Sequence, residues 1–255
     1  MELVCDLSVA SNYKSGAQIA RVVSEAWLAR NGYCLACDEE SLTRCLPNTR
    51  CTDFLCPTCG QNYELKAFAK RPGGSLVDGA YSTLINRIMV GSAPTLFLLQ
   101  RSPSWTVESF SAIHSVFLTP AVIEKRKPLG PGAERAGWVG CNIRLDRIGP
   151  DGEIKLVESG KERHKDEVRL QFRRFMSLST ISPTERGWTT LTLSVVRSLS
   201  KTRFRLSDLY EREGVFATCY PNNRNIRPKI RQQLQVLRDL GLILFEGNGE
   251  YRTNP

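Results

Sequence analysis

The sequence predicts a mixed α/β domain followed by a smaller domain of three helices and a hairpin. Residues 62–68 (NYELKAF) alternate in polarity as a strand does, and residues 95–99 (TLFLL) form the short apolar run of a buried strand. At residues 180–187 the composition shifts toward Ser, Thr, Pro and Gly, which indicates a linker. The 255 residues suffice for two domains, which we assign to 1–182 and 183–255.

Two helices are predicted in the first domain from N-cap candidates and from apolar residues at helical spacing, and one further strand is predicted. Ser15 can cap a first helix and Asp78 a second. Glu25 lies on the first helix, where we expect a solvated charge; the alternative is a place near a metal site. Trp138–Leu145 reads as another strand. The apolar residues at helical spacing are Ile19, Val22, Val23, Ala26 and Trp27, then Tyr81, Leu84, Ile85, Ile88 and Met89.

Two C-x2-C pairs predict a metal site. Cys34 and Cys37 are separated by eighteen residues from Cys56 and Cys59, the pattern of a four-thiolate zinc site. Such a site has no open coordination position, so the zinc would be structural; four separate thiols are the alternative. The spacing of Cys45 and Cys51 makes no knuckle. We expect Cys5, Cys141 and Cys219 to be small core residues.

The second cysteine pair joins two strand candidates into a hairpin. Residues 53–55 would pair with residues 62–68, where Glu64 and Lys66 share one face, and this places Asp53 beside them across the strand pair. Paired carboxylates suit Mg²⁺, and Lys66 could orient or help deprotonate a water and stabilise charge on a phosphate. By itself, this spacing is more often a solvated strand face.

The charge of the chain favours a polyanionic partner. The net charge is +9, although a solvated basic surface without a partner is the alternative. We find no signal peptide, and no apolar run long enough to span a membrane. We therefore expect a cytoplasmic protein without membrane contact, whose nine cysteines are thiols or metal ligands. No heptad indicates an obligate protein partner, so we expect a monomer.

The second domain has the pattern of a winged helix. Leu191, Val195, Val196 and Leu199 outline a helix, Ser207 can cap a short second one, and Pro228 can lie in the first turn of a third. Gly241 ends that helix, and residues 242–252 read as a hairpin. Between Pro183 and Pro255 the net charge is +5.

The third helix has the composition of a DNA recognition helix. Gln232 and Gln235 lie opposite its apolar stripe, where amides can read base edges. The basic and amide residues that flank them or lead into the helix are Arg224, Asn225, Arg227, Lys229 and Arg231. Any solvated helix also carries polar residues, so the group is the prediction rather than any single contact. A basic loop at residues 124–132 could likewise flank DNA phosphates.

These motifs together resemble a known family. Asp53 with Glu64-Leu65-Lys66 resembles the PD-(D/E)xK nuclease signature, with Thr52 in place of the usual proline. With the zinc knuckles, four further segments are similar to the DpnI-like, methyl-directed type II restriction endonucleases: residues 78–81, 126–129, 135–142 and 230–234. The similarity extends from about Tyr13 to Tyr251.

The resemblance implies a function that the composition of the chain does not predict. Relatives cleave double-stranded DNA at GATC when the adenine carries an N6-methyl group, and both domains read the methylated DNA. The expected catalytic residues are then Asp53, Glu64 and Lys66, with Mg²⁺ at Asp53, Glu64 and Leu65. Trp138 is a candidate contact for the methyl group, against the alternative of a core or loop anchor.

The sequence also has to be compared with three other functions. An HNH-type nuclease needs a catalytic histidine, but His114 and His164 are both distant in sequence from the knuckles. A non-catalytic zinc-containing winged-helix regulator leaves Asp53, Glu64 and Lys66 as coincidence. A reader that binds methylated DNA without cutting would require a damaged triad, and here the triad is intact.

Overall fold

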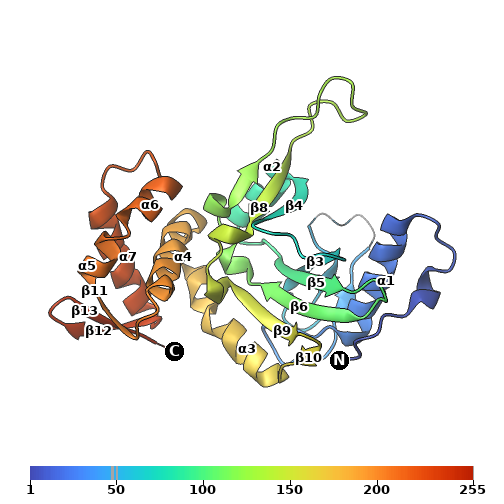
Figure 1. Ribbon diagram of the computed structural model, residues 1–255, viewed down its shortest axis with the longest axis horizontal. Coiled ribbons are helices and arrows are strands. Elements are labelled where there is room, and N and C mark those ends of the chain that lie inside the picture. Colours follow the sequence, from blue (N-terminus) through green and yellow to red (C-terminus); the bar gives the residue numbers. More distant parts are fainter. Residues whose placement is uncertain (47–48, 50, 255) are drawn as a thin grey trace.

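The computed structural model describes residues 1–46, 49 and 51–254, which form two parts side by side (Figure 1). The helices are α1 (Gly16–Asn31), α2 (Tyr81–Met89), α3 (Lys165–Arg174), α4 (Pro183–Ser198), α5 (Leu206–Tyr210), α6 (Glu213–Cys219) and α7 (Ile226–Asp239). The strands are β1 (Thr43–Arg44), β2 (Phe54–Leu55), β3 (Asn62–Phe68), β4 (Ser75–Ala80), β5 (Thr95–Arg101), β6 (Val107–Ile113), β7 (Ile123–Lys125), β8 (Gly140–Arg144), β9 (Glu153–Glu158), β10 (Lys161–Glu162), β11 (Arg203–Arg205), β12 (Ile243–Gly247) and β13 (Glu250–Thr253). Six short 3₁₀ turns are described, among them η2 (Ser115–Phe117), η3 (Pro120–Val122) and η6 (Met176–Thr180).

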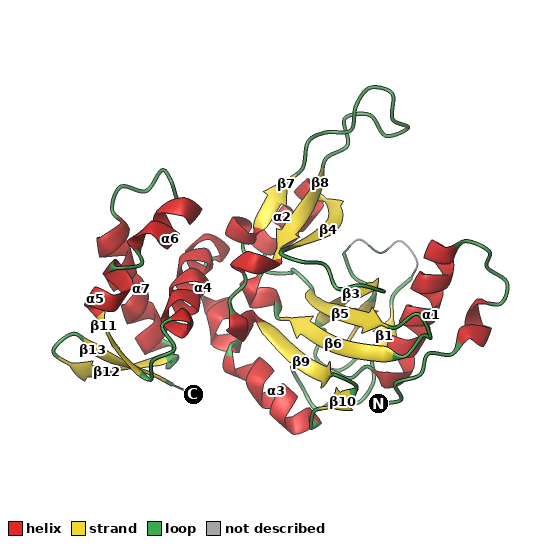
Figure 2. Cartoon of the chain, viewed as in Figure 1, coloured by secondary structure: helices red, strands yellow, loops and turns green. Residues whose placement is uncertain are grey.

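A seven-stranded sheet forms the centre of the first part. Its order is β1-β2-β3-β5-β6-β9-β10, and β3 and β5 are parallel whereas the other neighbours are antiparallel. The predicted strand at residues 62–68 is therefore correct, and the apolar run at 95–99 forms most of β5. Helices α1 and α3 cover one face of this sheet (Figure 2). Trp27 of α1 and Phe172 of α3 belong to the core on that side.

The other face of the large sheet is covered by a second layer. Helix α2 and a three-stranded sheet of order β4-β8-β7 pack there, with Leu84, Ile88 and Ile143 in the shared core. Strand β3 lies between these layers, and its side chains alternate between the two faces. Tyr63 therefore points into the core under α1 and α3, and Glu64 and Lys66 point toward the second layer.

The hairpin β7–β8 extends into a long loop that projects from the molecule (Figure 1). Residues 126–139 form this arm, and its base continues the ladder through hydrogen bonds from Arg126 N–H to the Gly140 carbonyl (3.0 Å) and from Leu129 N–H to the Trp138 carbonyl (2.9 Å). The Trp138 ring packs on Gly140, where a Cβ would lie 2.8 Å from the ring. A side chain at position 140 would therefore require the Trp138 ring to move.

The second part confirms the predicted winged helix, with one more helix than expected. Helices α4, α5 and α7 match the three predicted, α6 was not anticipated, and the small sheet has the order β11-β13-β12. Gly241, at φ +71°, follows α7 as expected. The Ser207 cap was wrong: α5 begins at Leu206, and the Asp208 side chain accepts from Arg205 N–H instead (2.7 Å).

The prediction of a linker at residues 180–187 is wrong, because residues 183–187 belong to a helix. Helix α4 begins at Pro183, with the Ser182 side chain accepting from Glu185 N–H (3.3 Å), so only two residues separate η6 from α4. One hydrophobic core continues across this point, because Phe117 and Phe175 of the first part pack with the buried residues of α4 and α7. Within the described residues, no helix combines the length and hydropathy that a bilayer crossing needs.

Candidate functional site

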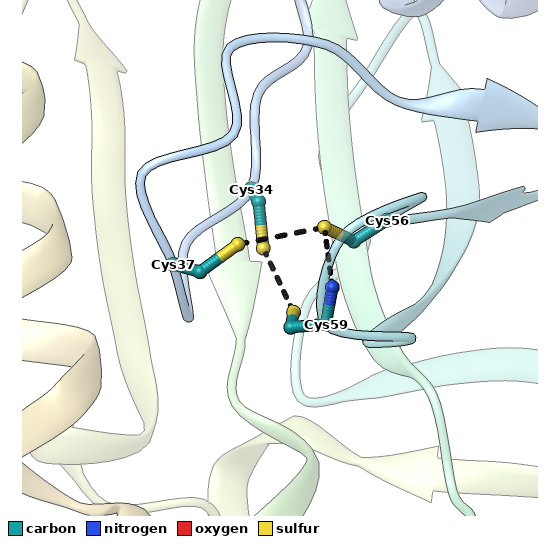
Figure 3. Close-up of side chains that lie close together, drawn as sticks. All are labelled: Cys34, Cys37, Cys56 and Cys59. Atoms are coloured by element: carbon teal, nitrogen blue, oxygen red, sulfur yellow. Dashed lines mark hydrogen bonds between the residues drawn. The ribbon is translucent and has the colours of Figure 1, made fainter.

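The four predicted zinc ligands meet in space. Figure 3 shows Cys34 and Cys37 on one loop facing Cys56 and Cys59 on another, and the ligand atoms all lie within 4.8 Å of one another. The Sγ atoms of Cys34 and Cys59 are 3.6 Å apart, and those of Cys37 and Cys56 are 3.5 Å apart. A tetrahedral zinc with Zn–S bonds of about 2.3 Å requires Sγ–Sγ distances of about 3.8 Å. The cluster could therefore hold zinc, and Cys45 and Cys51 lie outside it.

Two of the four cysteines, Cys56 and Cys59, lie in the turn of the hairpin β2–β3. Cys56 N–H donates to the Gln61 carbonyl (3.0 Å), and Gly60 makes the turn at φ +74°. The buried Tyr63 hydroxyl lies 3.2 Å from the Cys34 Sγ and accepts from Leu35 N–H (2.9 Å). Since Tyr63 precedes Glu64, these bonds connect the cysteine cluster to the strand that carries the candidate catalytic residues.

Asp53 lies just before β2, at the edge of β3. Its N–H donates to the Tyr63 carbonyl (2.9 Å), and its carboxylate accepts from Leu65 N–H (2.8 Å). The N–H and C=O of one strand residue point to the same side, so the Leu65 carbonyl also faces the Asp53 edge rather than β5. The preceding Thr52 accepts a hydrogen bond from Arg87 on α2 (3.0 Å), which anchors the position where the motif usually has proline.

A buried ion cluster lies on the neighbouring face of β3. Lys66 Nζ donates to Glu64 Oε1 at 2.6 Å and to Asp78 Oδ1 at 2.5 Å. The Asp78 side chain is 2% exposed, and within the described part of the chain Glu64 Oε2 and Asp78 Oδ2 are buried without a hydrogen-bond partner. Buried carboxylate oxygens without donors are costly unless a cation or water completes them. The donor set therefore fits a divalent cation that prefers oxygen ligands.

The charged groups in this cluster shift one another's pKa values. Burial raises the pKa of the Glu64 carboxyl, with Lys66 opposing and Asp78 reinforcing the shift. Burial also disfavours the charge of Lys66, but attraction to Glu64 and Asp78 outweighs it and raises the pKa of the Lys66 ammonium. Lys66 is thus a charged hydrogen-bond donor held between two carboxylates.

The expectation for Asp78 was wrong. It does not cap α2, whose N-cap is Ala80; it belongs to β4, and its side chain points inward together with Leu76. Reading residues 75–80 with a period of two would have put Leu76 and Asp78 on one buried face. Arg87 is a second residue that sequence reasoning missed, and no local pattern pointed to it.

The expectation for Glu25 was also wrong. Glu25 is 8% exposed rather than solvated, and it pairs with Arg44 and, at 3.4 Å, with Arg21. Glu25 and Asp53 line one cavity together with these two arginines. The alternative, a place near the carboxylate site, describes its position better, because α1 packs beside β3 and turns this side chain toward the Asp53 edge.

The candidate recognition residues lie on α7 and the segment before it. Gln232 and Gln235 are exposed, as predicted, whereas Gln233 is buried and accepts from Thr189 (2.6 Å). Three of the cations have neighbours: Arg227 pairs with Glu213 (2.8 Å), Arg231 donates to Tyr210 (2.9 Å) and Lys229 donates to Gln232 (2.8 Å). Arg224 and Asn225 are exposed at the start of the helix. These residues form one polar face.

Trp138 lies at the base of the arm and is partly exposed. Arg135 stacks over its ring at 5.0 Å, and Lys125 lies 5.6 Å from the Tyr81 ring at the foot of the same hairpin. Strand β8 pairs directly with β4, where Asp78 faces Cys141. The basic arm therefore rises from the same small sheet that supplies Asp78 to the ion cluster.

Two family profiles match the chain, one over each part. A profile described as DpnI, Dam-replacing family, covers residues 1–181. A second, described as the Dam-replacing HTH domain, covers residues 184–253. The two matches follow one another almost without a gap and take in nearly the whole chain.

Proposed function

Because the chain belongs to the DpnI, Dam-replacing family, a family of methylation-dependent restriction enzymes, we propose that it is a Mg²⁺-dependent endonuclease that cuts double-stranded DNA at GATC sites carrying N6-methyladenine. The observation that carries this proposal is the arrangement around β3: Asp53 accepts from Leu65 N–H at the edge of the strand, and Lys66 donates to Glu64 on its face. Residues 1–182 would cut the DNA, and residues 183–255 would bind it. We propose that the enzyme acts as a monomer in the cytoplasm, where its DNA substrate lies.

The proposed magnesium ligands are the carboxylates of Asp53 and Glu64 and the carbonyl of Leu65. The Glu64 Oε2 atom, buried and without a hydrogen-bond partner among the described residues, supports this assignment. When bound, the metal would supply Lewis-acid polarisation of the phosphate and a more acidic water. In the reaction, water oxygen bonds to phosphorus and one P–O ester bond breaks, leaving a phosphate monoester and a hydroxyl.

Lys66 would act as a donor to the reacting groups. Its ammonium gives one hydrogen to Glu64 and one to Asp78, and the third remains for the attacking water or a phosphate oxygen. A fixed cation beside the phosphate stabilises the charge that builds up in the transition state. The proposed zinc site has only a scaffold role, since two of its cysteines lie in the turn between Asp53 and Glu64 and the other two would fix that turn to the loop after α1.

Methyl recognition is proposed for two surfaces. Gln232 and Gln235 on α7 offer amides to adenine edges, and the flanking Arg224, Asn225, Arg227, Lys229 and Arg231 offer contacts to phosphates and bases. The N6-methyl group is an apolar addition to the adenine edge, so its reader must provide an apolar contact. Trp138, partly exposed at the base of the basic arm, is the candidate in the first part of the chain.

The experiment uses two plasmids that differ only in adenine methylation at GATC. With Mg²⁺, we expect the wild-type protein to cut the methylated plasmid alone, and the Asp53→Ala variant to cut neither. Cutting of both plasmids would retain the nuclease and refute the methyl dependence. If neither is cut while methylated DNA is still shifted in a gel, the protein is a non-catalytic reader.

A further inference from the structure

Asp78 comes from a different layer of the fold than the other members of the ion cluster. Glu64 and Lys66 lie two residues apart on β3, whereas Asp78 belongs to β4 of the small sheet and approaches Lys66 from the opposite side. A carboxylate that is 2% exposed has lost its hydration, and replacing that hydration requires strong partners. Among the hydrogen bonds of the described residues, the Asp78 carboxylate accepts only the one from Lys66.

The three N–H groups of the Lys66 ammonium point in different directions, and only two of them have acceptors among the described residues. An ammonium carries three N–H groups, and Glu64 and Asp78 each accept one. Without Asp78, Lys66 would be free to pair wholly with Glu64 and to reach its second oxygen, which is now without a partner. Asp78 thus has two effects: it directs the third N–H of Lys66, and it keeps one oxygen of Glu64 available.

We propose that Asp78 is a positioning residue for phosphodiester hydrolysis, holding the Lys66 ammonium away from Glu64 Oε2 and toward the scissile phosphate. This inference rests on the proposed function. In this proposal Asp78 acts through Lys66 and is not a metal ligand, although its Oδ2 is buried without a hydrogen-bond partner among the described residues; the Mg²⁺ titration below tests that distinction. A displacement of about 1 Å at a catalytic group can cost about 100-fold in rate.

The test compares Asp78→Ala and Asp78→Asn with the wild type on methylated duplex DNA. Single-turnover cleavage at saturating enzyme measures the chemical step, and fluorescence anisotropy without divalent metal measures DNA affinity. We expect Asp78→Ala to lower the cleavage rate about 100-fold with DNA affinity within about threefold of wild type. Asp78→Asn keeps an acceptor for Lys66, so we expect it to recover at least a tenth of the wild-type rate.

A matched control separates positioning from simple stability. Glu153 lies on β9 on the same face of the large sheet, and its partly buried carboxylate pairs with Arg71 and Lys155 (2.7 and 2.9 Å) without touching Lys66. We expect Glu153→Ala to keep the wild-type rate per folded molecule. If the rate of Asp78→Ala falls only in proportion to its folded fraction, as judged by thermal unfolding, Asp78 is structural and the proposal is wrong.

The Mg²⁺ requirement distinguishes positioning from metal binding. We expect the Mg²⁺ concentration for half-maximal rate to change by less than about threefold in Asp78→Asn. A rise of more than tenfold would make Asp78 a ligand and overturn the inference. Failure of the wild type to cut any DNA would overturn the proposed function and this inference together, whereas an Asp78→Ala variant that cuts as fast as wild type would overturn this inference alone.

Discussion

At the scale of single residues, burial separates functional charges from ordinary ones. Glu25, Glu64 and Asp78 each have a side chain that is less than one-third exposed and that pairs with a cation. Burial of a carboxylate is costly, so a chain keeps one where it is paired or where it binds a ligand. Glu64 and Asp78 pair with Lys66, and Glu25 lines a cavity with Asp53, which is why we propose that the chemistry takes place at this edge of β3.

His114 yields a prediction about acid stability. It is buried, stacks on Phe172 with ring centroids 3.8 Å apart, and accepts from Val116 N–H through Nδ1 (3.2 Å). Burial, with a contribution from the nearby Arg186, lowers the pKa of His114 to about 3. Below about pH 6.5 the unfolded chain therefore binds a proton that the folded protein does not, so stability falls as the pH falls from about 6.5 toward 3.

The variant His114→Asn keeps an acceptor for Val116 N–H but cannot titrate. Between pH 7 and pH 5 we expect the wild type to lose about 2 kcal/mol more unfolding free energy than this variant. Urea unfolding at the two pH values measures the difference. Equal losses in both proteins would show that folding does not lower the pKa of His114.

At the scale of elements, the hairpin β2–β3 joins two sites in one motif. Its turn carries Cys56 and Cys59, its first strand is preceded by Asp53, and its second strand carries Glu64 and Lys66. Because the turn sets the register of a hairpin, loss of the turn geometry moves the two strands relative to each other. The helix α1 adds Glu25 from the side, and β4 adds Asp78 from the layer above.

The zinc prediction follows from this arrangement. We expect Cys59→Ser to lower the zinc content, to destabilise the protein by at least about 3 kcal/mol, and to reduce cleavage of methylated DNA, although no cysteine takes part in the chemistry. Elemental analysis, thermal unfolding and the plasmid assay measure the three effects. Cys45→Ser is the control, because Cys45 lies in the same region outside the cluster. Full cleavage by protein stripped of zinc would refute the scaffold role.

At the scale of the whole molecule, the two parts share a core rather than a flexible connection. Phe117 and Phe175 pack edge to face at a centroid distance of 5.3 Å and belong to the same buried cluster as Trp188 and Leu234. An ion pair between Arg197 and Asp151 (2.7 Å) crosses the same boundary. We therefore expect α7 to keep a constant distance from the edge of β3 when the protein binds DNA.

The shared core predicts cooperative unfolding. Phe175→Ala removes a fully buried ring at the boundary, so we expect a loss of about 3–5 kcal/mol and one thermal transition at a lower temperature. Met176→Ala is the control, since the Met176 side chain is exposed and adjacent. Calorimetry distinguishes the outcomes: two separate transitions, of which only one shifts, would mean that the parts unfold independently.

The sequence by itself determined the features that contiguous residues encode. The alternation at 62–68, the C-x2-C spacing and the helical periodicity of α1, α4 and α7 each arise from repeats of two, three or four residues. These patterns were enough to predict the mixed α/β core, the four-cysteine cluster and the C-terminal winged helix. The hairpin was also predictable, because a short turn forces neighbouring strands to pair.

Only the tertiary structure decided which distant residues meet. The Asp78 carboxylate faces Lys66 because β4 packs over β3, and Glu25 faces the Asp53 cavity because α1 packs beside the same strand. The predicted linker is instead the start of helix α4, because Ser182 caps the helix, Pro183 is tolerated at its first position, and its buried face packs against η2, η3 and α7. The positions of Asp78 and Glu25 depend on contacts between residues far apart in the chain, and the local periodicity of a sequence carries no information about such contacts.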